Sequence, residues 1–308
     1  MPVKPVISYP GAKFKAWYLI KPLIPRDIKD WREPFFGGGS VSLLIASDPE
    51  FSLDRMIVGD IAPEVWAFWQ GCKEAGPEVV KKAKEIFTKW CPTQLEIQDM
   101  DTHDPSYDKM YEQSIEEGRK FWEWSQQVDC LAMDLVERAA RMVLVNRVSF
   151  SGMGDAGSLS KDRFSKFRFH QLDRITEAQP LLKKMEIKNC SFEETMADVD
   201  KDKTFIFLDP PYLNQEKSGL YGKDGETHHG FPHRHFAEFT KSMKCRWLVT
   251  YDDSINVRRL FRGCYLKPFK IPYTMAISNS ENALDGEELF IANYDIRDKT
   301  DESLIDLL

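Results

Sequence analysis

The segment FLDPPYLN, residues 207–214, places an aspartate, two prolines and a tyrosine directly after an apolar run. Proline has no N–H to donate to a sheet, so the preceding strand must end here. We therefore expect Asp209 and Tyr212 on a stiff turn at the carboxyl end of a buried strand, where ligands bind in open α/β sheets. In such a turn, the fixed carboxylate can accept hydrogen bonds from an amino group, and the aromatic ring beside it can stack on a planar ring.

A second stretch, EPFFGGGSV at 33–41, has three glycines between aromatic residues and a helical segment. Such a turn lets a ligand approach the backbone closely. It does not match G-x-G-x-x-G, and no G-K-[ST] follows, so a phosphate cradle is disfavoured. Asp60 ends the next strand, where an acid accepts hydrogen bonds from a ribose. The glycines and this acid predict a site for an adenosine-containing cofactor; a plain tight turn is the alternative.

Composition restricts the class of protein. The chain has 308 residues, of which 42% are hydrophobic and 30% charged, as in a soluble globular protein with room for a second lobe. No apolar run approaches the roughly 18 residues of a membrane helix, and the N-terminus has no export leader. Six scattered cysteines without a C-x-x-C pair indicate reduced thiols, so we expect a cytoplasmic protein. The net charge of −7 argues against a generally basic surface but allows a local basic face.

The elements that must position these residues alternate along the chain. Short apolar runs predict strands, and apolar residues at three- and four-residue steps predict helices. The expected strands are 55–60, 204–209, 246–252 and 288–294, with 265–273 as a hairpin partner of the last, and the expected helices are 78–90, 131–145 and 232–243. This alternation predicts an α/β fold with a doubly wound, mostly parallel, Rossmann-like sheet.

A helical and then basic-aromatic region interrupts this alternation. We expect residues 1–70 and 186–297 to form one domain, 71–185 to form an inserted lobe, and 298–308 to form an acidic tail.

Five stretches in this order resemble the adenine-N6 DNA methyltransferases of the Dam type: YPGAKFKAW at the N-terminus, EPFFGGGSV, GDIAPEV, DPPY and the closing GEELFIANY. The resemblance implies a methyltransferase fold with an inserted target-recognition lobe. It also implies transfer of a methyl group from S-adenosylmethionine to N6 of an adenine flipped out of double-stranded DNA.

The resemblance assigns the cofactor site residue by residue. Lys13 would pair with the methionine carboxylate, although a solvated surface lysine is the alternative. Ser191 stands where the family commonly has an acid, which leaves the role of its segment open. The full set of implied cofactor contacts is Tyr9, Lys13, Phe35 or Phe36, Gly37, Gly39, Asp60, Phe192 and Asp209.

The DPPY turn would carry the chemistry. The Asp209 carboxylate and the Pro210 carbonyl would accept the two amino hydrogens of adenine, and Pro210 and Pro211 would keep this acceptor pair rigid. Tyr212 would stack on the base, which offsets part of the cost of extruding it from the duplex. The chemistry needs no metal.

DNA contacts are expected from the basic-aromatic stretch and the segment just before it, NRVSFSG. Basic residues interleaved with aromatic ones suit nucleic-acid binding, whereas a solvated basic face above a phenylalanine core is the alternative. The candidates are Arg147, Ser151, Lys161, Arg163, Lys166 and Arg168. The polar segment 214–235 could fold over the extruded base, and its histidines do not suggest zinc, because no cysteine or paired acid accompanies them.

Three other functions stay open: a methyltransferase of RNA or cytosine N4, a catalytically inactive DNA-binding relative, and a small-molecule methyltransferase. The resemblance fits a restriction–modification role, with a cognate restriction endonuclease acting separately, or a solitary or phage enzyme. Either would act in the cytoplasm of a bacterial, archaeal or phage-infected cell.

Overall fold

Seven strands form one sheet in the computed structural model of the chain, which describes residues 4–213, 230–272 and 285–297. The sheet order is β3-β2-β1-β4-β5-β7-β6. The first five strands in this order are parallel, and β7 is antiparallel to both of its neighbours, β5 and β6. The strands are β1 (Asp30–Glu33), β2 (Arg55–Asp60), β3 (Glu186–Asn189), β4 (Thr204–Leu208), β5 (Arg246–Asp252), β6 (Tyr265–Pro272) and β7 (Asp285–Ala292).

The predicted doubly wound, mostly parallel sheet is confirmed. Strands β2 and β5 have the expected bounds, and β6 pairs with β7 as expected. β7 begins three residues before the predicted 288 and ends two residues before the predicted 294. β1 and β3 were not predicted, because the four-residue segments DWRE and EIKN contain no apolar run.

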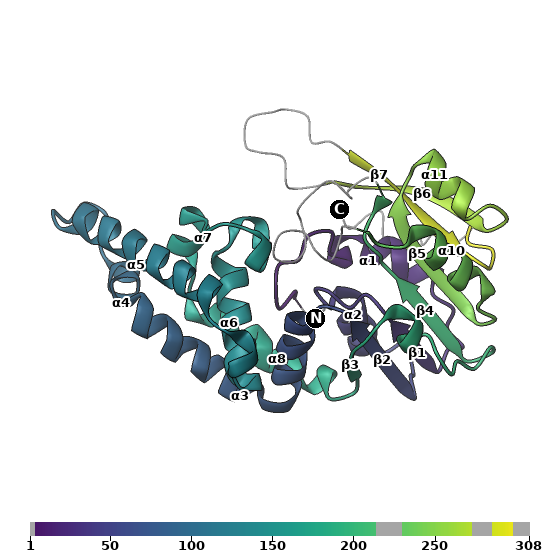
Figure 1. The fold of residues 1–308 in the computed structure, drawn as a ribbon, viewed down its shortest axis with the longest axis horizontal. Coiled ribbons are helices and arrows are strands. Elements are labelled where there is room, and N and C mark those ends of the chain that lie inside the picture. The colour runs from purple at the N-terminus through teal and green to yellow at the C-terminus, as the bar shows by residue number, and fades with distance from the viewer. Residues whose placement is uncertain (1–3, 214–229, 273–284, 298–308) are drawn as a thin grey trace.

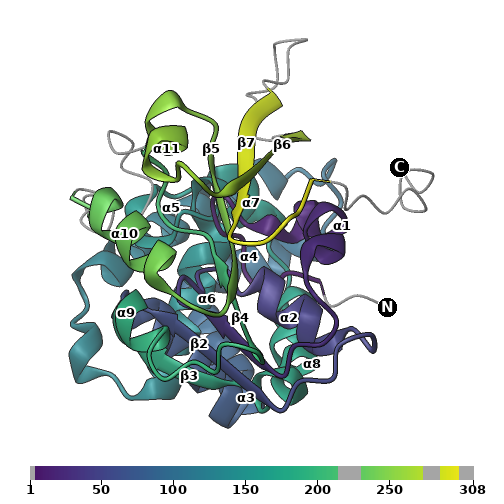
Figure 2. The ribbon, with the colours of Figure 1, turned by 90° about the vertical axis from the view of Figure 1, so that its right-hand side faces the viewer.

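Helices cover both faces of the sheet. β4 shows why, since Phe205 and Phe207 pack into one hydrophobic core while Ile206 and Leu208 pack into the other. Helices α1 and α2 lie on one face and α10 and α11 on the other (Figure 2). The helices of the sheet domain are α1 (Trp17–Ile20), α2 (Ser40–Ser47), α9 (Phe192–Thr195), α10 (His233–Ser242) and α11 (Ile255–Leu260).

The remaining helices form a lobe beside the sheet (Figure 1). They are α3 (Pro63–Trp90), α4 (Pro92–Glu96), α5 (Tyr107–Gln127), α6 (Leu135–Val148), α7 (Lys161–Lys166) and α8 (Asp173–Leu182). Helix α3 packs against α6 and α8 and bends at Ala75, because Pro77 lacks the N–H that a continuous helix needs. The boundary expected at 70/71 therefore lies inside a helix that begins directly after β2.

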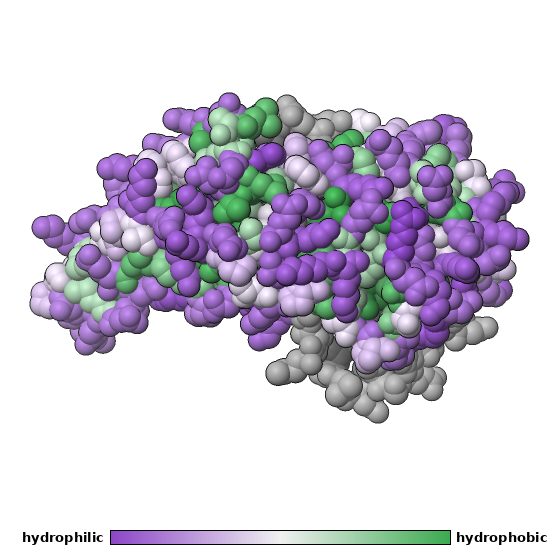
Figure 3. Space-filling model, turned by 90° about the horizontal axis from the view of Figure 1, so that it is seen from below, coloured by the Kyte–Doolittle hydropathy of each residue, from purple (hydrophilic) through white to green (hydrophobic). Residues whose placement is uncertain are grey.

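Seen from below, the surface is mostly hydrophilic, with small apolar patches between the polar side chains (Figure 3). In the described part of the chain, no helix is both long enough and apolar enough to cross a membrane. The expected acidic tail at 298–308 and the segment 214–229 lie outside the described residues.

Candidate active site

The carboxyl ends of β1, β2 and β4 border one cavity of about 1050 Å³. Helix α2 follows β1 on one face of the sheet, and α10 follows β4 on the other, so the chain reverses its winding between these neighbouring strands (Figure 2). Doubly wound folds bind ligands at such a reversal. The helical lobe lines the opposite side of the cavity with residues of α5, α6 and the 152–156 turn.

The glycine loop after β1 has the backbone conformation that its sequence requires. Gly37 and Gly39 have φ values of 44° and 66°, in the left-handed region that favours glycine. A side-chain carbon at Gly37 would lie only 2.8 Å from the Tyr9 ring, so the loop packs directly on the N-terminal segment. The indole N–H of Trp69 donates to the Gly37 carbonyl at 2.8 Å and fixes the loop from the helical side.

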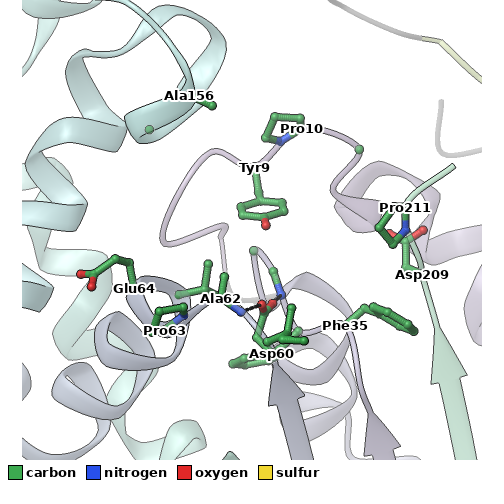
Figure 4. A pocket seen from close by; sticks show the side chains of 18 of the residues that line it. Tyr9, Pro10, Phe35, Asp60, Ala62, Pro63, Glu64, Ala156, Asp209 and Pro211 are labelled. Carbon is green, nitrogen blue, oxygen red and sulfur yellow. Dashed lines mark hydrogen bonds between the residues drawn. The ribbon is translucent and has the colours of Figure 1, made fainter. Parts of the chain in front are cut away.

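Asp60, at the end of β2, ties this loop to the next one. One carboxylate oxygen accepts from the Gly37 N–H at 2.8 Å, and the other accepts from the Ala62 N–H at 2.9 Å. Burial raises the pKa of Asp60 to about 6, although the two backbone N–H groups oppose this shift. The side chain lies under Tyr9 at the floor of the cavity (Figure 4). An acid fixed there suits the hydroxyls of a ribose.

Three aromatic side chains surround the same part of the cavity. Phe35 stacks on Phe192, with ring centroids 5.9 Å apart, and both residues line the cavity. Phe36 is buried against Trp69 at 5.0 Å, so its ring mainly packs in the core. The Phe35–Phe192 pair is therefore the better candidate for contact with an adenine ring.

Ser191, which stands where an acid was expected, caps α9 through a reciprocal pair of hydrogen bonds with Glu194.

Glu33 is a buried acid that the sequence analysis did not select. It ends β1 and accepts hydrogen bonds from the N–H and the hydroxyl of Ser42. Burial, together with the nearby negative charges of Asp209 and Asp60, raises the pKa of Glu33 to about 8, although the hydrogen bonds from Ser42 oppose this shift. Two features of the sequence could have indicated Glu33: the adjacent Pro34, and the position of Glu33 just before a glycine loop. It was missed because β1 was not recognised as a strand.

Asp209 follows β4 and borders the cavity together with Pro210 and Pro211 (Figure 4). Within the described residues, its two polar partners both contact Oδ1: the Thr250 hydroxyl at 2.6 Å and the Lys13 ammonium at 2.9 Å. Oδ2 is thus the oxygen available to a substrate. Burial raises the pKa of Asp209, and the charge of Lys13 opposes that shift.

Lys13 is not a solvated surface lysine, since its side chain is only 3% exposed. Its ammonium donates to the Gly11 carbonyl at 2.7 Å and pairs with Asp209. The expected partner was the methionine carboxylate of a cofactor, and that pairing stays a prediction. What the structure adds is a direct link between the N-terminal segment and the DPPY turn.

Tyr212 lines the cavity but is largely enclosed, with 8% of its surface exposed. Its ring stacks on Tyr251 at 5.7 Å, and its hydroxyl donates to Glu288 at 2.7 Å. The Lys13 ammonium lies 4.9 Å from the ring centroid. Tyr251, Glu288 and Lys13 therefore fix the position of the Tyr212 ring, and its stacking on a base stays a prediction.

A sequence profile described as D12 class N6 adenine-specific DNA methyltransferase matches residues 9–279, which include the helical lobe and every strand of the sheet except β7. The chain belongs to this family. It is therefore a DNA adenine methyltransferase that uses S-adenosylmethionine, and the predicted transfer to adenine N6 in DNA is confirmed.

Three relatives are similar over most of the chain. The Type II methyltransferase M.MjaIII of Methanocaldococcus jannaschii is 23% identical over 72% of this chain and 73% of its own. M1.LlaDCHI of Lactococcus lactis subsp. cremoris is 22% identical over 94% of this chain and 84% of its own. M.CviBI of Paramecium bursaria Chlorella virus NC1A is 20% identical over 95% of this chain and its full length.

The D12 methyltransferase places much of its predicted DNA-binding stretch inside the lobe. Phe164 and Phe167 are fully buried. The guanidinium groups of three candidates instead donate to main-chain carbonyls: Arg147 to Val6 and Gln171, Arg163 to Asn146 and Arg147, and Arg168 to Ser165 and Phe167. The donors of these arginines hold loops of the lobe together, and DNA contact by Arg147, Arg163 and Arg168 stays a prediction.

The other candidates are accessible. Lys161 and Lys166 are exposed on α7, and Lys166 pairs with Asp162 one turn away. Ser151 has a φ of 51° in a turn beside the cavity. Phe150, which the sequence analysis did not select, is 56% exposed in the same turn. The sequence does not show that Phe150 is exposed or that Ser151 has a positive φ, because both depend on the conformation of the turn.

The histidines after the DPPY turn fall into two groups. His228 and His229 lie outside the described residues. The His233 ring contacts the Tyr251 hydroxyl, and His235 contacts Glu193 at 2.9 Å. In the described residues, no group of three or more His, Cys, Asp or Glu side chains is placed to hold a metal ion.

Proposed function

We propose that this methyltransferase modifies an adenine rotated out of double-stranded DNA, and that the DPPY turn receives the base. The observation that carries the proposal is the position of Asp209 and Asp60 at one continuous cavity, with one acid suited to an amino group and the other to a ribose. An adenine paired inside a duplex cannot reach an acid at the carboxyl end of a sheet strand.

Asp209 and Pro210 prepare the amino group for attack. The lone pair of an exocyclic amine is delocalised into the ring, so acceptors for both hydrogens favour the nucleophilic geometry. Oδ2 of Asp209 is one acceptor and the Pro210 carbonyl is the other. A hydrogen bond to a charged acceptor contributes about 1.5–3 kcal/mol. Lys13 and Thr250 hold the opposite oxygen, so the carboxylate does not need to reorient during the reaction.

The cofactor residues fit S-adenosylmethionine, which supplies an electrophilic methyl group on a sulfonium. Asp60 would accept from the ribose hydroxyls, and the Phe35–Phe192 pair would pack on the adenine. The backbone of the glycine loop at Gly37 and Gly39 would lie beside the methionine portion, near Tyr9 and Lys13. These assignments follow from the shared cavity and from the polarity of its lining.

DNA would lie against the helical lobe. The turn that borders the cavity carries Ser151 and the exposed Phe150, and Lys161 and Lys166 can meet backbone phosphates. Residues 1–70 and 186–297 would then carry catalysis, and 71–185 would carry target recognition. Because the three relatives are named Type II methyltransferases, we assign this enzyme to the modification side of a restriction–modification system.

Radiolabelled methyl transfer to matched duplex DNA, single-stranded DNA and RNA tests the proposal, with nucleoside analysis of the products. We expect N6-methyladenine, formed fastest in the duplex. A second measurement replaces the target adenine with 2-aminopurine, whose fluorescence should rise on binding as the base leaves the stack. Faster transfer to RNA, or unchanged fluorescence on a duplex that the enzyme binds, would contradict it.

A further inference from the structure

Two acids stand opposite each other on β5 and β7. Asp252 and Glu288 are register partners in this antiparallel pair, and only 9% and 2% of their surfaces are exposed. Like charges at directly opposed positions destabilise a sheet, because their side chains share one face. Two buried acids in this arrangement need hydrogen-bond donors or cations that offset their repulsion. The residues that supply them indicate the role of the pair.

Donors to this pair from the described part of the chain include the DPPY turn and Lys13. Glu288 accepts the Tyr212 hydroxyl at 2.7 Å, and Asp252 accepts the backbone N–H of Leu213 at 3.0 Å. The same Glu288 oxygen lies 3.8 Å from the Lys13 ammonium. Two neighbouring residues of the turn are thus held by two neighbouring strands.

We propose that Glu288 is a positioning residue of the methyl transfer, which fixes the Tyr212 ring and shares the Lys13 ammonium with Asp209. This inference rests on the proposed roles of Asp209 and Tyr212. A hydroxyl bond at the far end of a tyrosine restrains the ring more than packing alone, so the face offered to the base is set in advance. A second carboxylate near Lys13 keeps that cation from neutralising Asp209 completely, which preserves its strength as an acceptor.

The charges around Asp209 make this role measurable. Lys13 from the N-terminal segment, Glu33 from β1 and Glu288 from β7 all act on it, Thr250 of β5 donates to it, and Asp252 faces Glu288. The negative charge of Glu288 raises the pKa of Asp209, in the same direction as burial. Removing that charge should therefore move the acid limb of the rate profile to lower pH.

The experiment compares Glu288→Gln, Tyr212→Phe and the unaltered enzyme in kcat and in kcat/KM for duplex DNA across pH. Glu288→Gln should lower kcat by about tenfold or more and shift the acid limb to lower pH. Tyr212→Phe removes the same hydroxyl bond but keeps the charge, so it should lower kcat with the limb in place. A kcat within about twofold of the unaltered enzyme for Glu288→Gln, or an unmoved limb, overturns the inference.

Two further variants keep the outcome decisive. If Glu288→Gln fails to fold, Glu288→Asp takes its place, because it retains the charge while its shorter side chain withdraws from Tyr212. This variant should lower kcat and leave the acid limb in place. An unchanged kcat overturns the inference. Asp209→Ala separates this inference from the proposed function. An inactive Asp209→Ala beside a fully active Glu288→Gln refutes only the role of Glu288, whereas an active Asp209→Ala refutes the acceptor role itself.

Discussion

The Lys13 ammonium lies 2.9 Å from Oδ1 of Asp209, although the two residues are far apart in the sequence. The contact joins the N-terminal segment to the end of β4. It also balances the acceptor charge before either ligand arrives, which lowers the cost of burying a carboxylate.

Asp209→Ala should abolish most methyl transfer, because it removes the charged acceptor for the adenine amino group. We expect kcat to fall by at least about a hundredfold, as when a preorganised hydrogen-bonding partner is removed from other active sites. Binding of S-adenosylmethionine, measured by calorimetry, should persist at least in part, because the ribose and adenine contacts lie near β1 and β2. Normal methylation by this variant would refute the assignment.

Asp60→Asn should weaken cofactor binding more than it slows the reaction. The amide cannot accept from both the Gly37 and Ala62 N–H groups and also from a ribose, so the dissociation constant should rise about tenfold or more. At saturating cofactor, kcat should change much less. Equal cofactor affinity in the variant and the unaltered enzyme would contradict the ribose role.

Glu33 should make stability depend on pH. Its pKa rises from an ordinary 4.5 to about 8 on folding, so the folded chain binds the extra proton and stability falls as pH increases through this window. Glu33→Gln has no such proton to lose. Its unfolding free energy, from urea titrations between pH 5 and pH 8, should therefore decline less than that of the unaltered protein.

Glu123→Gln is the matched control for that experiment, because Glu123 is an exposed acid on α5. Its pH dependence should match that of the unaltered protein. Equal slopes for Glu33→Gln and Glu123→Gln would mean that Glu33 is ionised in the folded state at neutral pH.

Paired removal of Lys161 and Lys166 should weaken DNA binding with a shallower dependence on salt. Two lost phosphate contacts reduce the slope of log K against log salt by about one to two. Replacing Lys201 and Lys203, exposed residues at the opposite end of β4, should leave the slope unchanged. Arg163→Ala should instead lower the melting temperature, because its side chain holds the carbonyls of Asn146 and Arg147.

The sequence predicted those parts of the fold that are written in local patterns. Apolar runs ending in an acid located β2, β4 and their two site residues, Asp60 and Asp209. The glycine loop was predicted because left-handed turns require glycine, as Gly37 and Gly39 show. Four-residue polar strands such as β1 carry no such pattern, so Glu33 at its end was missed.

Other features depend on partners that are distant in the sequence. The arginines of the lobe were predicted to contact DNA because of their charge and their aromatic neighbours. Their partners in the structure are backbone carbonyls, which a sequence does not reveal. Glu288 acquires its role from strand register, which places it opposite Asp252 and within reach of Tyr212. Neither relationship could be inferred without the tertiary structure.

The route of the chain around the sheet has an evolutionary consequence. It leaves the sheet at the carboxyl end of β2, at Asp60, and returns at the amino end of β3, at Glu186. The whole lobe is therefore inserted between two strands that are direct neighbours in the sheet. Under the division of roles proposed above, exchanging this insertion would change the target sequence, provided that the residues around Val6 and Ser8 are exchanged with it. Those residues bond to Arg147 and Asn146, and they are the second attachment that any such chimera must preserve.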